Sequence, residues 1–93
     1  MRLAGDTYEL RAAPDPPVRP LLAQPLRSGM VALRRLPRAD GRVAWTLLAP
    51  PLAGLRVNGR RLWLGIHVLQ DGDELRLPGA VDLRFSTNDL DPV

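Results

Sequence analysis

Apolar and polar residues alternate with a period of two along three segments of the chain. The apolar positions are Tyr8, Leu10 and Ala12 in residues 7–12, Val43, Trp45 and Leu47 in residues 42–48, and Val81, Leu83 and Phe85 in residues 80–86. Successive side chains of a β-strand point to opposite faces, so each segment predicts a strand with one buried face. Residues 30–36 and 62–64 are predicted strands with less regular alternation. No segment keeps the 3.6-residue apolar period of a helix, and ten prolines interrupt the chain.

Turn-forming pairs of residues separate the predicted strands. Asn58 and Gly59 stand between two short apolar runs, and this pair tolerates the positive φ angles of a type I′ hairpin turn. Further turn signals are Asp40-Gly41, Asp71-Gly72 and Pro78-Gly79. Short strands with a turn about every ten residues are typical of an all-β sandwich or barrel. The side chains expected in its core include Trp45, Val57, Leu62, Leu75, Leu77 and Leu83.

The remaining segments are less regular. Residues 13–27 contain five prolines, so we expect mostly loop there, with an edge strand over residues 19–23. Residues 88–93 are acidic and contain a proline, so we expect a frayed C-terminal tail after a single domain of residues 1–87.

Length and composition exclude several classes of protein. A chain of 93 residues, 45% of them hydrophobic, is expected to bury one modest core. Without cysteine it has no disulfide, thiolate metal site or cysteine nucleophile, and no cofactor is predicted. No apolar run approaches the roughly 20 residues that cross a bilayer, and residues 1–10 lack the apolar region of a signal peptide. We therefore expect a cytoplasmic protein with no membrane partner.

All 13 basic residues are arginine, and the net charge is +3. Two predicted hairpins concentrate them, the first with Arg34, Arg35, Arg38 and Arg42 and the second with Arg56, Arg60 and Arg61. Such clusters attract nucleic acid or an acidic partner. No aromatic residues interleave with them to form a stacking platform for bases. The favoured interpretation is therefore solvated arginines that discourage edge-to-edge pairing of strands.

The order of signals in the C-terminal half resembles the end of a forkhead-associated (FHA) domain. V-N-G occupies residues 57–59, L-x-x-G-D-x-L-x-L occupies residues 69–77, and a closing L-x-F occupies residues 83–85. The resemblance covers residues 54–86 well and residues 28–53 less closely. It implies a two-sheet β-sandwich of about eleven short strands, the SMAD/FHA-like fold, with ligands bound by loops at one end.

The resemblance also implies where a phosphothreonine site would lie. The family uses the arginine of a G-R pair, the serine of S-x-x-H and the asparagine of S-x-N-G. Ser28 matches the serine, but Val31 replaces the histidine. Gly54 matches the glycine, but Ala53 replaces the asparagine, whose amide both donates and accepts hydrogen bonds. The candidate phosphopeptide-binding residues are therefore Arg19, Ser28, Gly54 and Arg56, with Arg19 preceded by valine instead of glycine.

An apolar run replaces the polar contacts that the family places before this glycine. Residues 47–53 read L-L-A-P-P-L-A, and the candidate partner-binding loop within them is Pro50, Pro51, Leu52 and Ala53. Two interpretations stay open: the loop folds onto the core, or it is an exposed hydrophobic contact site.

Isolated polar residues give little indication of chemistry. His67, the only histidine, is expected to be structural. Asp71, Asp73 and Glu74 are explained by turn chemistry, so no metal site is predicted. No paired catalytic residues or phosphate-cradling loop can be assembled, so an enzyme is not expected.

The leading hypothesis is a non-catalytic FHA-like adaptor that does not depend on phosphothreonine. It would dock a protein or peptide partner, or another domain of its own polypeptide. The first alternative is a phosphothreonine reader with atypical anchors, and the second is an arginine-rich β-module that binds nucleic acid.

Overall fold

The computed structural model describes residues 1–11, 17–21, 30–50, 54–62, 65–79 and 81–93, and all its regular elements are β-strands. These are β1 (Thr7–Leu10), β2 (Val18–Pro20), β3 (Val31–Pro37), β4 (Val43–Leu48), β5 (Arg56–Val57), β6 (Arg60–Arg61), β7 (Ile66–Val68), β8 (Glu74–Leu77), β9 (Val81–Ser86) and β10 (Asp89–Pro92). The predicted all-β class is confirmed, with ten strands in the described part of the chain where about eleven were expected.

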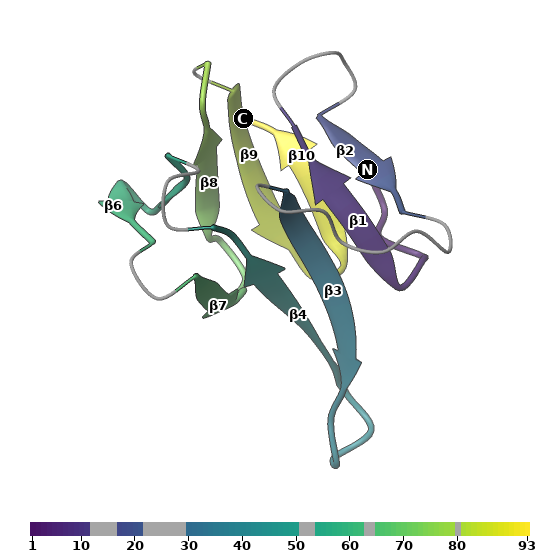
Figure 1. The fold of residues 1–93 in the computed structure, drawn as a ribbon. Coiled ribbons are helices and arrows are strands. Elements are labelled where there is room, and N and C mark those ends of the chain that lie inside the picture. Colours follow the sequence, from purple (N-terminus) through teal and green to yellow (C-terminus); the bar gives the residue numbers. More distant parts are fainter. Residues whose placement is uncertain (12–16, 22–29, 51–53, 63–64, 80) are drawn as a thin grey trace.

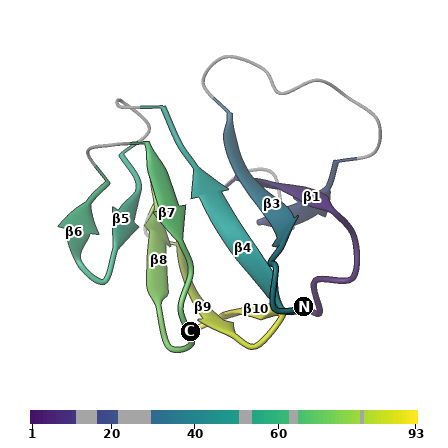
Figure 2. The same ribbon diagram turned by 90° about the horizontal axis from the view of Figure 1, so that it is seen from below.

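The strands form two antiparallel sheets that pack face to face (Figures 1 and 2). Sheet I has the strand order β2–β1–β3–β4–β7, and sheet II has the order β10–β9–β8–β5–β6. Both views place β6 and β7, the last strands of the two sheets, on the same flank. The hairpin of β3 and β4 projects beyond the other strands (Figure 1). The two-sheet sandwich predicted from the sequence is therefore confirmed.

The alternating segments supply the interior between the sheets. The Tyr8 and Trp45 rings lie 5.9 Å apart at an angle of 56°. The indole N–H of Trp45 donates a hydrogen bond to Oδ1 of Asn88 at 2.8 Å, which satisfies the polar atom of a buried ring and links sheet I to the turn before β10. Leu62 is only partly buried against the core, whereas the other five side chains expected there are buried: Trp45, Val57, Leu75, Leu77 and Leu83.

The Asn58-Gly59 turn has the predicted geometry. Asn58 has a φ of 52° and Gly59 a φ of 80°, as a type I′ turn between β5 and β6 requires. The Asn58 side chain also fixes this turn to the next hairpin, because its Oδ1 accepts the backbone N–H of Glu74 at 2.9 Å.

The expectation of a frayed C-terminal tail is wrong. Residues 89–92 form β10, which pairs with β9, and Leu90 is only 1% exposed. The turn that starts this strand has no glycine, because Thr87 and Asn88 take up its positive φ angles. Leu90 gains its burial opposite Phe85, and the backbones of Leu90 and Met1 exchange hydrogen bonds. A proline is tolerated here because β10 is an edge strand.

Two other strand boundaries differ from expectation. The predicted edge strand over residues 19–23 is β2, which lies at the edge of sheet I but begins at Val18 and ends at Pro20. A strand was also expected at residues 62–64. Leu62 follows β6 and belongs to no strand, and residues 63 and 64 lie outside the described residues.

Candidate functional site

The structure does not bring the described phosphopeptide-site candidates together. Arg19 lies on β2 directly opposite Glu9, on the side of sheet I that faces away from the core. Arg56 lies on β5 opposite Arg76, on the outer side of sheet II, and its Nη1 donates to the carbonyl of Gly59 at 3.3 Å. Gly54 precedes β5 with a φ of 70°. Ser28 lies outside the described residues.

The apolar run before Gly54 is described only in part. Ala49 is buried, and its N–H donates to the carbonyl of Gly65 at 2.8 Å, so this part of the run folds onto the sandwich. Pro50 is half-buried. The other members of the candidate partner-binding loop, Pro51, Leu52 and Ala53, lie outside the described residues.

His67 and Asp73 form a polar contact across one flank of the sandwich. Nε2 of His67 lies 2.9 Å from Oδ2 of Asp73, and the same carboxylate accepts the Asn58 amide and the Gln70 N–H, each at 2.9 Å. Burial alone would raise the pKa of Asp73, but the hydrogen bonds from His67, Gln70 and Asn58 outweigh it and lower the pKa. An ionised carboxylate only accepts, so Nε2 of His67 carries the proton. His67 thus links β7 to the turn before β8.

The carboxylates near Asp73 also form hydrogen bonds or ion pairs with nearby residues. Asp71 accepts the N–H and the hydroxyl of Thr87, and these hydrogen bonds lower its pKa. Glu74 pairs with Arg84. Within the described residues no group of three or more histidine, aspartate or glutamate side chains could hold a metal ion. Turn and strand chemistry therefore accounts for these acids.

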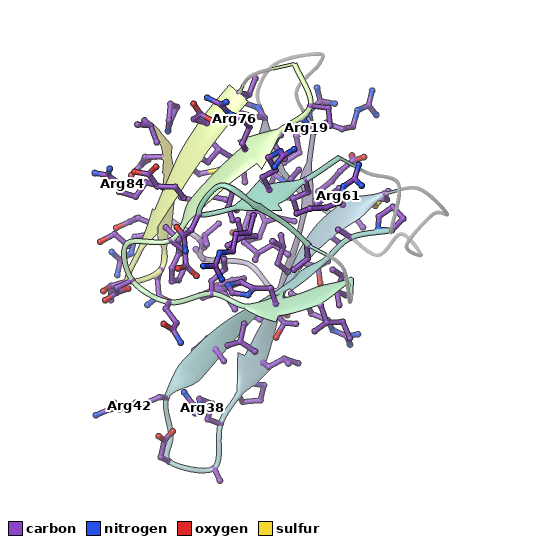
Figure 3. The ribbon with its side chains drawn as sticks, turned by 90° about the vertical axis from the view of Figure 1, so that its left-hand side faces the viewer. Arg19, Arg38, Arg42, Arg61, Arg76 and Arg84 are labelled. Carbon is purple, nitrogen blue, oxygen red and sulfur yellow. The ribbon has the colours of Figure 1, made fainter. Side chains whose placement is uncertain are left out.

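The outer face of sheet II is covered by ion pairs between neighbouring strands. Arg76 of β8 makes a two-pronged contact with Asp82 of β9, with Nε and Nη2 donating at 2.8 and 3.0 Å. This pairing lowers the pKa of Asp82 and raises that of Arg76. Arg76 and Arg84 lie on this sheet, away from the arginines at the turn of the projecting hairpin (Figure 3). Such a face is well solvated.

The outer face of sheet I is different in character. The register of β3, β4 and β7 places eight side chains on it: Ala32, Arg34 and Leu36 of β3, Ala44, Thr46 and Leu48 of β4, and Ile66 and Val68 of β7. We call Leu36, Ala44, Thr46, Leu48, Ile66 and Val68 the apolar face. The exposed Arg34 lies among them, directly opposite Thr46. Ile66 is 59% exposed, Val68 49% and Leu36 42%. The other large hydrophobic residues exposed in the described chain are the terminal Met1 and Val93, so the exposed apolar side chains of the body gather on one face.

Thr46 lies in the middle of the apolar face. It is only 6% exposed, and its hydroxyl has no hydrogen-bond partner within the described structure. A buried polar group without a partner costs about 1–3 kcal/mol. The site therefore carries a local cost in the isolated chain.

The β3–β4 hairpin, which supplies four of the six residues of the apolar face, is strongly basic toward its projecting turn. Residues 34–43 hold four arginines and one aspartate, so this hairpin carries the whole net charge of +3. Arg38 and Arg42 face each other at its turn, where the Arg38 N–H donates to the Arg42 carbonyl at 2.8 Å (Figure 3). The surface thus combines an apolar centre with a positive end.

Sequence reasoning missed Ile66 and Val68 as surface residues. Apolar, polar, apolar alternation in Ile66-His67-Val68 is usually a sign that the apolar pair is buried. Here the order is reversed, because His67 lies opposite the buried Leu47 and points inward to Asp73. The only signal in the sequence is that histidine, which needs a polar partner when it is turned inward.

Comparison with protein-family models, curated proteins and solved structures gives no match to this chain. No helix in the described part of the chain is long and apolar enough to cross a membrane.

Proposed function

We propose that this chain is a non-catalytic protein-interaction module that docks a protein partner on the apolar face of sheet I. The observation that carries this proposal is the gathering of Leu36, Ile66 and Val68 on one side of one sheet. Contiguous exposed apolar side chains rimmed by charge are typical of interaction surfaces.

The partner is an acidic protein. The hairpin beside the apolar face holds the net positive charge of the chain, and complementary potentials steer partners and fix their orientation. The resemblance to FHA domains, a family of binding modules, supports this class of function, and the proposed site of action is the cytoplasm.

Phosphothreonine is not required for this docking. We expect phosphothreonine peptides from a degenerate library to bind no tighter than about 100 μM, or roughly −5.5 kcal/mol. Calorimetric titration with matched threonine and phosphothreonine peptides tests this. Low-micromolar binding that disappears without the phosphate would favour a phosphothreonine reader instead.

Site-specific photo-crosslinking tests the docking surface directly. A photoreactive residue is placed at Ile66 or Leu36, or at Arg84 on sheet II as a matched control, and crosslinking is carried out in the native host cells. We expect one acidic protein to crosslink from the first two positions only. Its co-purification should fall at least tenfold in an Ile66→Asp, Val68→Asp double variant and stay unchanged in Arg84→Ala. Equal crosslinking from both faces, or none, would contradict the proposal.

Nucleic acid is the competing partner for an arginine-rich hairpin. Titration with a 20-base-pair DNA duplex at increasing salt separates the two, because binding through phosphates weakens steeply with salt. Tight duplex binding that is lost in an Arg38→Ala, Arg42→Ala variant would assign the hairpin to nucleic acid and overturn the protein-docking proposal.

A further inference from the structure

The edge of sheet I at β7 presents backbone hydrogen-bonding groups outward. The Ala49 N–H donates to the Gly65 carbonyl, and the Leu69 N–H donates to the Trp45 carbonyl, each at 2.8 Å. In an antiparallel ladder the backbone groups of alternate residues point to opposite sides. Gly65, His67 and Leu69 therefore face β4, and the N–H and C=O groups of Ile66 and Val68 face away from it.

Apart from its short length of three residues, the described side chains of this edge carry none of the usual devices against pairing. Natural edge strands carry lysine, proline, a bulge or an inward charge that discourages another strand. Within β7, Ile66 and Val68 are β-branched, apolar and exposed on the outer side. The one polar residue of the strand, His67, is held inward by Asp73. β7 is therefore a ready template for a further strand.

The backbone at the start of β7 is held firmly. Gly65 has a φ of 76°, and a Cβ at this position would come within 2.9 Å of the Ala49 carbonyl oxygen. At the other end, the Leu69 N–H is bonded to β4. A receptor strand that is fixed at both ends loses little conformational freedom when it binds.

A cavity lies on the inward side of the same flank. It has a volume of about 460 Å³ and is lined by Val57, Asn58, Arg60, Arg61, Leu62 and His67, none of which is acidic. Its lining residues come from β7 of sheet I and from the β5–β6 hairpin of sheet II with Leu62 after it. A strand added beside β7 would direct every second side chain into this cavity and the others outward beside Ile66 and Val68.

We infer that β7 accepts an extended segment of the partner as an additional strand, and that this segment alternates apolar and acidic side chains. The apolar side chains extend the apolar face, and the acidic ones enter the cavity beside Arg60, which lies opposite the buried Val57. This inference rests on the proposed function and names the chemistry of the partner at that site.

A designed peptide tests the inference without knowledge of the natural partner. The probe is the end-blocked heptapeptide Ser-Val-Glu-Val-Glu-Val-Ser, and the control has lysine in place of both glutamates. Binding is followed by NMR titration and by hydrogen exchange of the β7 amides. We expect the glutamate peptide to bind at least tenfold more tightly than the lysine peptide and to slow exchange of the Ile66 and Val68 N–H groups at least tenfold.

Two variants separate backbone pairing from charge. Ile66→Pro removes an N–H that faces the open edge, a position that proline tolerates, and should abolish binding. Arg60→Glu should weaken the glutamate peptide at least tenfold and strengthen the lysine peptide, while Arg60→Lys retains most of the affinity. Arg84→Glu, on the outer face of β9 and not among the residues that line the cavity, is the control for charge reversal and should leave the binding of both peptides unchanged.

The failures of the two proposals are distinguishable. Strand addition is overturned if the glutamate peptide has a Kd above 1 mM. It is also overturned if the peptide binds without slowing hydrogen exchange of the Ile66 and Val68 amides. Crosslinking from Ile66 and Leu36 to an acidic protein would still uphold docking on the apolar face. Loss of both results overturns both proposals.

Discussion

The outer faces of the two sheets are built from similar strands and have opposite characters. On sheet II the register places Arg76 opposite Asp82 and Glu74 opposite Arg84, so charges of opposite sign neutralise one another across neighbouring strands. On sheet I the register instead sets Leu36 beside Ala44, Leu48 beside Ile66, and Thr46 between Val68 and Arg34, the one charged residue among them. The outer face of sheet II carries paired charges that water solvates well. The outer face of sheet I exposes apolar side chains and holds the Thr46 hydroxyl, which has no hydrogen-bond partner in the described structure.

This difference shows that exposed apolar side chains can be confined to the outer face of one sheet in a small sandwich. The side chains between the sheets pack in the same way under both faces, since Leu47 and Leu83 are each fully buried. Fold stability therefore comes from the shared interior, while the apolar face of sheet I contributes little to it and is the surface that we propose for docking.

The largest expected effect comes from the shared interior. Leu47→Ala in sheet I and Leu83→Ala in sheet II should each lower the free energy of unfolding by about 2–5 kcal/mol, because each leaves a cavity in the core. Leu48→Ala is the matched control, because its side chain is half-buried on the apolar face. Urea denaturation measures all three. A change within 0.5 kcal/mol for Leu83→Ala would show that the inner and outer faces have been assigned wrongly.

The next effect concerns the hydroxyl at the centre of the apolar face. Thr46→Val should raise the free energy of unfolding by about 1 kcal/mol, because it removes a buried polar group that has no partner. Thr46→Ser, which keeps the hydroxyl and loses a methyl group, should not stabilise the chain. Thermal unfolding of both variants provides the measurement, and a destabilised Thr46→Val protein would mean that the hydroxyl is satisfied in solution.

Acid should weaken the polar contacts associated with sheet II. The pKa values of Asp71, Asp73 and Asp82 are all lowered in the folded chain from 3.8. Because the pKa of each carboxyl is lower in the folded chain, the unfolded chain binds protons first as the pH falls. The stabilisation that these carboxylates give the fold is therefore complete above pH 3.8 and is lost as the pH falls through their pKa values in the folded chain.

Asp73→Asn isolates one of these groups. The variant should be less stable than the wild type at pH 7, and the difference should shrink as the pH falls below about 4. Urea midpoints measured between pH 2 and pH 7 follow this. A difference that stays constant over this range would indicate that Asp73 keeps its ordinary pKa.

The smallest effect on stability is expected on the apolar face itself. Ile66→Lys should change the free energy of unfolding by no more than about 0.5 kcal/mol, as is usual for exposed positions. The same variant should elute earlier from a hydrophobic-interaction column, whereas Arg84→Lys on sheet II should not. A loss of more than 1 kcal/mol in the free energy of unfolding would show that Ile66 is part of the core. The two outer faces would then differ less than proposed.

Local chemistry in the sequence determined the strands with regular alternation and the glycine-containing turns. Tyr8 and Leu10, or Leu83 and Phe85, are two residues apart, and in a strand this spacing alone places them on one face. Asn58 and Gly59 tolerate the backbone angles of a type I′ turn whatever surrounds them. The sandwich architecture followed from these features, because several short one-faced strands need another sheet to cover them.

Only the tertiary structure decided the features that depend on what each strand meets. The segment that forms β10 has little strand character by itself and is ordered because Leu90 finds a place in the core and Asn88 accepts the Trp45 N–H. Ile66 and Val68 face outward because Asp73, which directly precedes β8 of the other sheet, accepts a hydrogen bond from His67 on the inner side. Burial and cross-sheet hydrogen bonds are properties of the assembled fold, so a pattern read along one strand cannot contain them.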